Sequence, residues 1–137
     1  DRAEELGADI GELSYERLVG GLYLNAARQT DLGDYGAAVR AWRALLAYQT
    51  TYKGIDIQRQ IFNQYVLFGD AWVFGGQPCR AVPEYTNALN LFNDARVSGK
   101  RDAAQQACAS VTPTPDPNNP GTAPGAPTVA PLGVPGT

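Results

Sequence analysis

Apolar residues recur every three or four positions through residues 12–48, and a glycine corner divides them into two runs. Gly33 can adopt the left-handed conformation that ends one helix, and Asp34 can cap the next by accepting a backbone N–H. The pattern predicts two antiparallel helices, with Arg40 and Arg43 outside the buried stripe. The first stripe contains Leu13, Leu18, Leu22 and Ala26, and the second contains Ala38, Trp42, Leu45 and Leu46.

The same arrangement returns in residues 56–92. Asp56 can cap a helix, Gly76 marks a turn, and Pro78 stands in the first turn of the next helix, where its missing N–H is harmless. The two pairs together predict an all-α fold of antiparallel helical hairpins. The third helix carries Ile61, Tyr65, Phe68 and Trp72 on its main stripe, and the fourth carries Ala81, Tyr85, Ala88, Leu89 and Phe92.

The N-terminal end of the chain has a weaker pattern. Residues 1–11 have some helical character, but Gly7 and Gly11 interrupt it. The regular pattern becomes firm only from Glu12, and Ser14 is an alternative cap for the helix that follows.

The C-terminal end changes composition sharply. Eight of the ten prolines lie within residues 111–137, which contain one acid, Asp116, and no basic residue. This segment has too few large apolar residues for a core and is typical of an extended, polyproline-like arm, such as a linker or a glycosylated stalk. The stretch 100–109 before it is predicted to be a capping helix. We interpret residues 1–110 as a helical domain and the remainder as an arm.

Small and aromatic residues occupy equivalent places in the two hairpins. The first has Gly33-Asp34-Tyr35, then Ala38 and Trp42; the second has Gly76, Ala81, Tyr85 and Ala88, preceded by Tyr65, Phe68-Gly69 and Trp72. This arrangement resembles the tetratricopeptide repeat, which has a period of about 34 residues. The resemblance covers residues 19–95, and it implies an array of paired helices that binds other proteins.

The first unit departs from the repeat more than the second, at Leu45, Asn25-Ala26 and Gln29. Neither unit ends with the usual proline. The glycine corners at positions 33 and 76 are also about nine residues further apart than the period of about 34 allows, so we expect an insertion around residues 50–58 to bulge out. Their spacing also falls in the range of about 40–47 residues that HEAT and armadillo repeats show, which is the alternative resemblance.

In tetratricopeptide repeats, the first helix of each pair lines a concave wall that binds partners. By position, the resemblance implies that this partner-binding groove contains Tyr23, Ala27, Thr30, Asn63, Val66, Asp70 and Val73. Asp70 lies between Phe68 and Trp72, where a charge is costly unless it is paired. It is either an anchor for a partner or the acceptor of a hydrogen bond or ion pair from an arginine within the bundle.

The chain has two cysteines, Cys79 and Cys108. Cys79 begins the last repeat helix, and Cys108 lies late in the predicted capping helix. If the capping helix packs antiparallel to its neighbour, the two sulfurs meet, and a disulfide stabilises the fold by about 3–4 kcal/mol on the chain-entropy estimate. Two buried free thiols are the alternative.

The sequence offers few groups for catalysis. It has no histidine, no cysteine pair at zinc spacing and no phosphate-binding glycine motif, so we expect no metal and no cofactor. Glu4-Glu5 and Asp9 with Glu12 are the remaining acid–base candidates, and a solvated surface is the simpler interpretation of both. A net charge of −3 has the wrong sign for binding nucleic acid. We expect a non-catalytic protein, with a carboxylate-dependent hydrolase as a distant alternative.

The location is inferred from the processing of the chain. No apolar run reaches the 18–20 residues, roughly, that span a bilayer. The absence of methionine indicates that Asp1 is a processed end or the boundary of a fragment, and removal of a signal peptide would explain it simply. Since two cysteines also suit an oxidising compartment, we expect an extracytoplasmic protein. The combined interpretation is a scaffold or interaction subunit of a secreted or cell-envelope complex that binds other protein subunits. Self-association into a homo-oligomeric surface assembly is the alternative.

Overall fold

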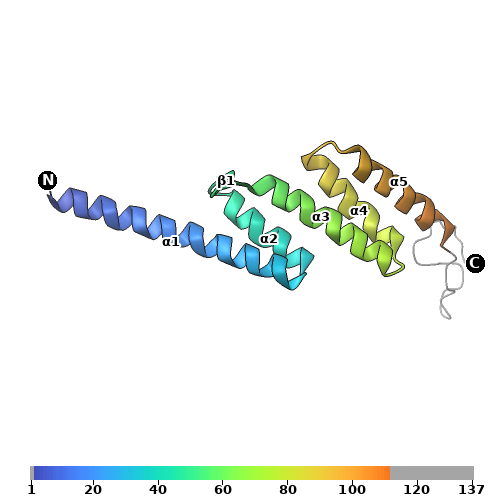
Figure 1. The fold of residues 1–137 in the computed structure, drawn as a ribbon, viewed down its shortest axis with the longest axis horizontal. Helices are drawn as coiled ribbons and strands as arrows, with labels where there is room; N and C mark the ends of the chain where they lie inside the picture. Colours follow the sequence, from blue (N-terminus) through green and yellow to red (C-terminus); the bar gives the residue numbers. More distant parts are fainter. Residues whose placement is uncertain (1, 112–137) are drawn as a thin grey trace, which may run out of the picture.

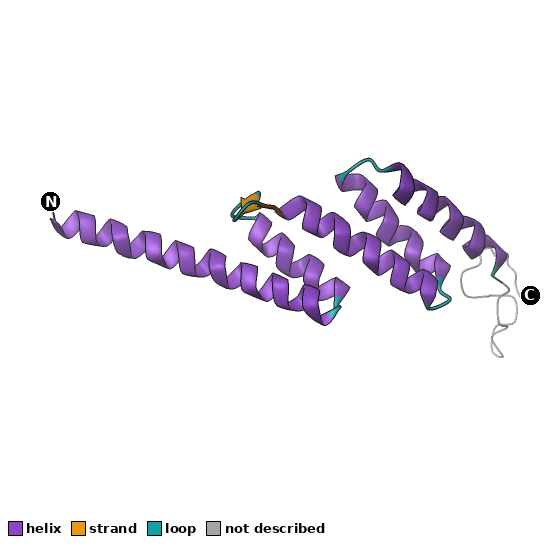
Figure 2. Ribbon diagram, in the orientation of Figure 1, coloured by secondary structure: helices purple, strands orange, loops and turns teal. Residues whose placement is uncertain are grey.

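The chain folds into a row of helices in which each helix packs against its neighbour along the sequence (Figure 1). A computed structural model describes the backbone of residues 2–111 and the side chains from residue 11 onward. The predicted all-α class is confirmed, since helices make up most of this part of the chain (Figure 2). Residues 112–137, which belong to the predicted arm, lie outside the described part of the chain. The helices are α1 (Arg2–Leu32), α2 (Tyr35–Leu46), α3 (Ile57–Phe74), α4 (Pro78–Leu91) and α5 (Ala95–Ser110).

The first helix is longer than the sequence pattern predicts. α1 is continuous through Gly7 and Gly11, which were expected to interrupt it, and Ser14 lies within the helix and caps nothing. Its N-terminal half projects beyond α2, because α1 has 31 residues and α2 has 12 (Figure 1). The described side chains of this half, residues 11–18, are all exposed.

The buried face of α1 therefore differs from the predicted stripe. Val19 and Ala26 are buried, and Leu22 packs at the edge of the core. Leu13 and Leu18, which were expected in the stripe, are exposed because α2 ends before it can cover them. Only the C-terminal half of α1 thus contributes to the first hairpin.

The corner between α1 and α2 forms as predicted. Gly33 has a φ of 73°, and the Asp34 carboxylate accepts a hydrogen bond of 3.1 Å from the backbone N–H of Ala37. Trp42 on α2 is buried, and its indole N–H donates a 2.9 Å hydrogen bond to the Thr30 hydroxyl on α1. Of the predicted stripe, Ala38, Trp42 and Leu45 are buried, and Leu46 is partly buried at the edge of the core.

The expected insertion is a β-hairpin. β1 (Thr51–Tyr52) pairs antiparallel with β2 (Ile55–Asp56), placing the first residue of each strand opposite the last of the other. Lys53 and Gly54 both have positive φ, at 49° and 80°, as a tight two-residue hairpin turn requires. Asp56 then caps α3 as predicted, because its carboxylate accepts a hydrogen bond from the N–H of Arg59.

Helix α3 is the central element and packs against both α2 and α4. Ile61 and Tyr65 are buried as predicted. Phe68 and Trp72, on the same predicted stripe, are only half-buried, and their rings stack with a centroid separation of 5.6 Å. The Arg80 guanidinium on α4 covers the Trp72 ring at 4.9 Å from its centroid.

Helices α4 and α5 extend the row, with α4 antiparallel to α3 and α5 antiparallel to α4. Gly76 has a φ of 77° at the turn, and Pro78 is the first residue of α4. α5 begins at Ala95, earlier than the stretch 100–109 in which a capping helix was predicted. It starts there because the Asp94 carboxylate accepts hydrogen bonds from two backbone N–H groups in its first turn.

Candidate functional site

A concave surface lies at the end of the molecule where α3 ends, α4 begins and α5 runs alongside. Its cavity measures about 550 Å³. We call this surface the α3–α5 groove. Its apolar walls are Val73 and Phe74 from α3, Pro78 from α4, and Ala103, Ala104 and Ala107 from α5, and the side chains of Asp70, Tyr85 and Lys100 complete the lining. Nearly all of this lining is apolar, and the small alanine side chains let another backbone approach α5 closely.

A second cavity of about 410 Å³ lies further along the same two helices. Asn63 and Val66 of α3 face Asp94 and Arg96, at the beginning of α5, across this cavity. Lys100 lines both cavities, so the two are neighbours on one surface. This second cavity is more polar than the α3–α5 groove.

Asp70 and Lys100 join α3 to α5 between the two cavities. The Lys100 ammonium lies 3.0 Å from each carboxylate oxygen of Asp70, and both side chains are partly exposed. An ion pair exposed to this degree contributes less than about 1 kcal/mol to stability. The pair fixes the positions of both charges, so neither side chain presents an unpaired charge to the groove.

Tyr85 of α4 lines the inner side of the groove and is hydrogen-bonded to Asp70. Its hydroxyl donates a 2.6 Å hydrogen bond to the Asp70 carboxylate, while its ring is 2% exposed. Burial raises the pKa of Tyr85 well above its ordinary value, and the hydrogen bond to the negatively charged Asp70 raises it further. Asp70 is thereby engaged by a phenol and an ammonium, which leaves it poorly suited to act as a general base.

Phe74 forms the outer rim of the groove. It is the last residue of α3 and is 95% exposed, while the adjacent Val73 is 45% exposed. A single exposed apolar side chain is ordinary on a protein surface, but here the phenylalanine borders an apolar cavity. This combination is typical of a surface that other protein segments cover.

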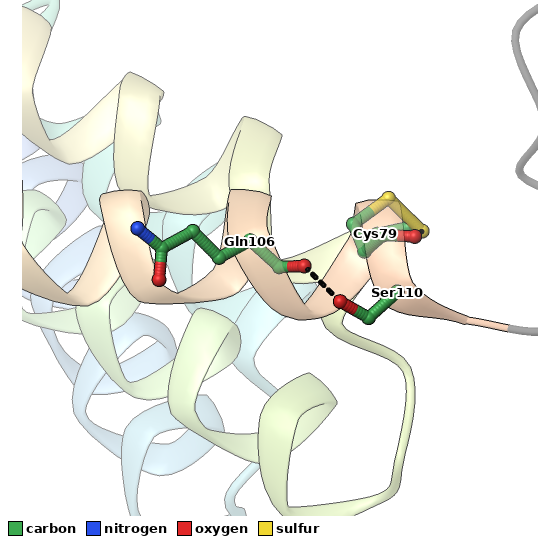
Figure 3. The surroundings of a disulfide bond; sticks show 4 residues. Cys79, Gln106 and Ser110 are labelled. Carbon is green, nitrogen blue, oxygen red and sulfur yellow. Dashed lines mark hydrogen bonds between the residues drawn. A yellow bond between two sulfur atoms is a disulfide. The ribbon is translucent and has the colours of Figure 1, made fainter.

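A disulfide fixes the α4 and α5 walls of the groove. Cys79, the second residue of α4, is bonded to Cys108 near the end of α5, with 4.7 Å between their Cα atoms (Figure 3). The predicted bond is therefore present. In the same turn, the Ser110 hydroxyl donates a 2.9 Å hydrogen bond to the carbonyl of Gln106. The covalent link holds Pro78 beside Ala107, one residue from each cysteine.

The seven residues predicted for the groove separate into two groups. Those on α3 lie together along the surface shared with α5: Asn63 and Val66 at the second cavity, and Asp70 and Val73 at the α3–α5 groove.

Those on α1 pack toward α2 and the hairpin. Tyr23 lies 5.8 Å from the Trp42 ring and 4.9 Å from the Tyr52 ring, between ring centroids. Thr30 accepts the Trp42 hydrogen bond, and Ala27 is half-buried. The side chains of Tyr23 and Thr30 are thus used in internal packing and hydrogen bonding.

The role predicted for Asp70 needs one correction. Its ion-pair partner is Lys100, whereas an arginine was expected, and its second partner is Tyr85. Lys100, Ala103 and Ala107 were not predicted as groove residues, because the stretch 100–109 was interpreted only as a capping helix. The signal that could have found the alanines is their spacing of four, which places them on one helix face.

Two described carboxylates outside the groove bear on acid–base chemistry. Glu12 is exposed, as expected for a solvated carboxylate. Burial raises the pKa of Glu84, an effect that hydrogen bonds from Trp72 and Asn87 partly offset. Within the described part of the chain, no group of three or more His, Cys, Asp or Glu side chains could hold a metal ion.

Among the described residues, every helix is too short or too polar to cross a membrane.

Comparison of the chain with protein-family models, with curated proteins and with solved structures finds no significant match. The repeat resemblance therefore rests on the sequence motifs alone, and the candidate site rests on its geometry.

Proposed function

We propose that the chain is a non-catalytic interaction subunit of an extracytoplasmic protein complex and that it binds a partner protein in the α3–α5 groove. The observation that carries this proposal is the pairing of an apolar cavity of about 550 Å³ with a fully exposed phenylalanine at its rim. A partner segment that covers Phe74 and fills the cavity gains the free energy of removing apolar surface from water. The Asp70–Lys100 pair at one side supplies polar groups that fix the register of that segment.

Two further features support the proposal. α3 is the first helix of the unit that matches the tetratricopeptide pattern better, and that family binds partners on its first helices. The Cys79–Cys108 disulfide is consistent with an oxidising compartment, as expected for a secreted or cell-envelope subunit.

Purification from the native source tests this function. Ala107 and Ala109 are both exposed residues of α5, but only Ala107 lines the groove. Ala107→Arg places a bulky cation in the cavity, while Ala109→Arg adds the same side chain on another face of the helix. We expect a tagged wild-type chain and Ala109→Arg to retain a second protein that Ala107→Arg loses. Equal retention by all three would show that the partner binds elsewhere.

Self-assembly is the second candidate, and the projecting half of α1 favours it. Leu13, Tyr15 and Leu18 are exposed on this half, beyond the end of α2. A second copy of the chain could cover the two leucines and the exposed part of Tyr15, whose ring also contacts Tyr48, since burying exposed apolar side chains stabilises an association. Light scattering of the purified chain tests this: a homo-oligomer that Leu13→Ser with Leu18→Ser dissociates supports assembly, and a monomer excludes it.

A further inference from the structure

The chain leaves α5 next to the α3–α5 groove. Ala107 lines the groove one turn before the helix ends at Ser110. Val111 then has an extended backbone, with φ −65° and ψ 126°, and is 44% exposed. The segment 112–137 follows directly in the sequence, so its first residue is five positions after Ala107 of the groove wall.

The composition of that segment suits the groove. Its eight prolines include two pairs at the spacing of a polyproline helix turn, Pro117 with Pro120 and Pro124 with Pro127. Polyproline segments lose little conformational entropy on binding and dock in grooves that present aromatic rings. The segment also has no basic residue and a single acid, so docking it in the groove removes little charge of its own from water.

The lining of the groove provides the matching surface. Phe74 offers an exposed ring and Pro78 a second flat apolar surface. Opposite them, Ala103 and Ala107 leave room for a backbone to lie against α5. The nearby charges, Asp70 and Lys100, are already paired with each other, so an uncharged segment can lie beside them without breaking an ion pair.

The segment is long enough to reach. From Lys100 to Ser110, α5 rises about 15 Å, at about 1.5 Å per residue. About five residues of polyproline helix cover that distance, at about 3.1 Å each. The segment 112–137 is several times longer than this, which leaves ample residues to reverse direction after Val111.

We propose that residues 112–137 dock in the α3–α5 groove of the same chain as a polyproline strand and thereby compete with the partner. The inference rests on the proposed function, because it concerns the same groove. A tethered segment has an effective concentration on the order of 1 mM. A contact with a dissociation constant of about 0.1 mM is then formed in about nine of ten molecules, whereas a second copy at micromolar concentration would rarely form it.

Docking of the chain's own segment lowers the apparent affinity of the groove for the partner. A partner must displace the segment, so with nine of ten grooves occupied its apparent affinity is about tenfold weaker than its intrinsic affinity for an open groove. The partner recognised by this groove is accordingly expected to present a proline-rich, uncharged segment of its own, which competes for the same apolar surface.

NMR of the full-length chain tests the docking. In the wild type we expect NOEs from proline ring protons of residues 112–137 to the Phe74 ring and to the methyl groups of Ala103 and Ala107. Ala107→Arg should abolish them, and Ala109→Arg should preserve them. Phe74→Ala provides a second test, because a side chain that is 95% exposed can be removed without unfolding the helix. Absence of these NOEs in the wild type, or their persistence in Ala107→Arg, would overturn the proposal.

An isotope-filtered experiment on mixed samples decides which molecule supplies the segment. Equal amounts of differently labelled chains should give no NOE between molecules if docking occurs within one chain. Intermolecular NOEs would overturn docking in the same chain and support exchange between copies. If Ala107→Arg loses its partner but the wild type shows no NOEs from the segment, the proposed function stands and this inference alone fails.

Discussion

Gly69 on α3 lies directly against the ring of Tyr85 on α4, and a Cβ at position 69 would lie 2.5 Å from Cε1 of that ring. The ring has little freedom to move away, because it is 2% exposed and its hydroxyl is held by Asp70. The close approach of α3 to α4 therefore requires glycine at this position. The same close approach places the Tyr85 hydroxyl within hydrogen-bonding distance of Asp70.

Gly69→Ala is expected to lower the free energy of unfolding by about 1–3 kcal/mol, because overpacking outweighs the helix propensity gained. Chemical denaturation followed by circular dichroism measures the change. Gly99→Ala is the matched control: Gly99 also lies within a helix, but a Cβ there meets no atom within 4 Å. The control should gain about 0.5–1 kcal/mol. Equal effects at the two positions would contradict the close contact.

Loss of the disulfide is expected to destabilise the chain by about 3–4 kcal/mol, on the estimate for a closed loop of 29 residues. Replacing Cys79 and Cys108 with serine, or adding reductant, should lower the free energy of unfolding measured by chemical denaturation by a similar amount. Thiol titration of the unfolded, unreduced chain should detect no free thiol. Detection of two free thiols would show that the bond does not form.

Tyr85 predicts a specific dependence of stability on pH. Its pKa is raised in the folded state, so the folded state holds the phenolic proton more tightly than the unfolded chain does. The contribution of the protonated Tyr85 to the free energy of unfolding is complete below the pKa of about 10 that tyrosine has in the unfolded chain. It is lost as pH rises through the higher pKa of the folded state. We expect the wild type to lose thermal stability above pH 10, roughly, more steeply than Tyr85→Phe.

The ultraviolet absorbance of phenolate provides the accompanying measurement. One of the seven tyrosines should resist ionisation until the chain unfolds, and Tyr85→Phe should remove that delayed step. If Tyr85→Phe leaves the absorbance titration of the folded protein unchanged in shape, Tyr85 is not buried against Asp70 in solution.

Thr30 distinguishes a structural role from a binding role on α1. Thr30→Val removes the acceptor for the Trp42 indole N–H and is expected to cost about 1–3 kcal/mol, because a buried donor loses its partner. Thr86→Val is the control, since the Thr86 hydroxyl only donates to the carbonyl of Val82 in its own helix. Denaturation should show a clearly larger loss for Thr30→Val. A loss of partner binding at unchanged stability would instead place Thr30 in the binding surface.

The sequence predicted those parts of the fold that depend on local signals. Gly33 and Gly76 adopt positive φ, and Asp34 and Asp56 accept the expected capping hydrogen bonds. These features depend on a few neighbouring residues, so a single sequence contains them. The bond between Cys79 and Cys108 was also predictable, because it follows once α5 packs antiparallel to α4.

The features that could not be predicted depend on the lengths of the helices and on how they pack against one another. Leu13 and Leu18 share the periodicity of a buried stripe, yet α2 is too short to cover them. Asp70 could be predicted to need a partner, but Lys100 belongs to a helix thirty positions later whose face toward α3 is set by packing. The groove likewise arises from the meeting of three helices, and no local pattern marks it.

The most direct test of binding through the α3–α5 groove is site-specific photo-crosslinking in the native cells. Photoreactive p-benzoylphenylalanine replaces Phe74, which is 95% exposed, and in a control chain replaces Leu24, which is 68% exposed on α1. The account predicts that position 74 forms an adduct heavier than the chain itself, containing another protein, and that position 24 does not. Adducts of equal yield from both positions, or none heavier than the chain from position 74, would contradict it.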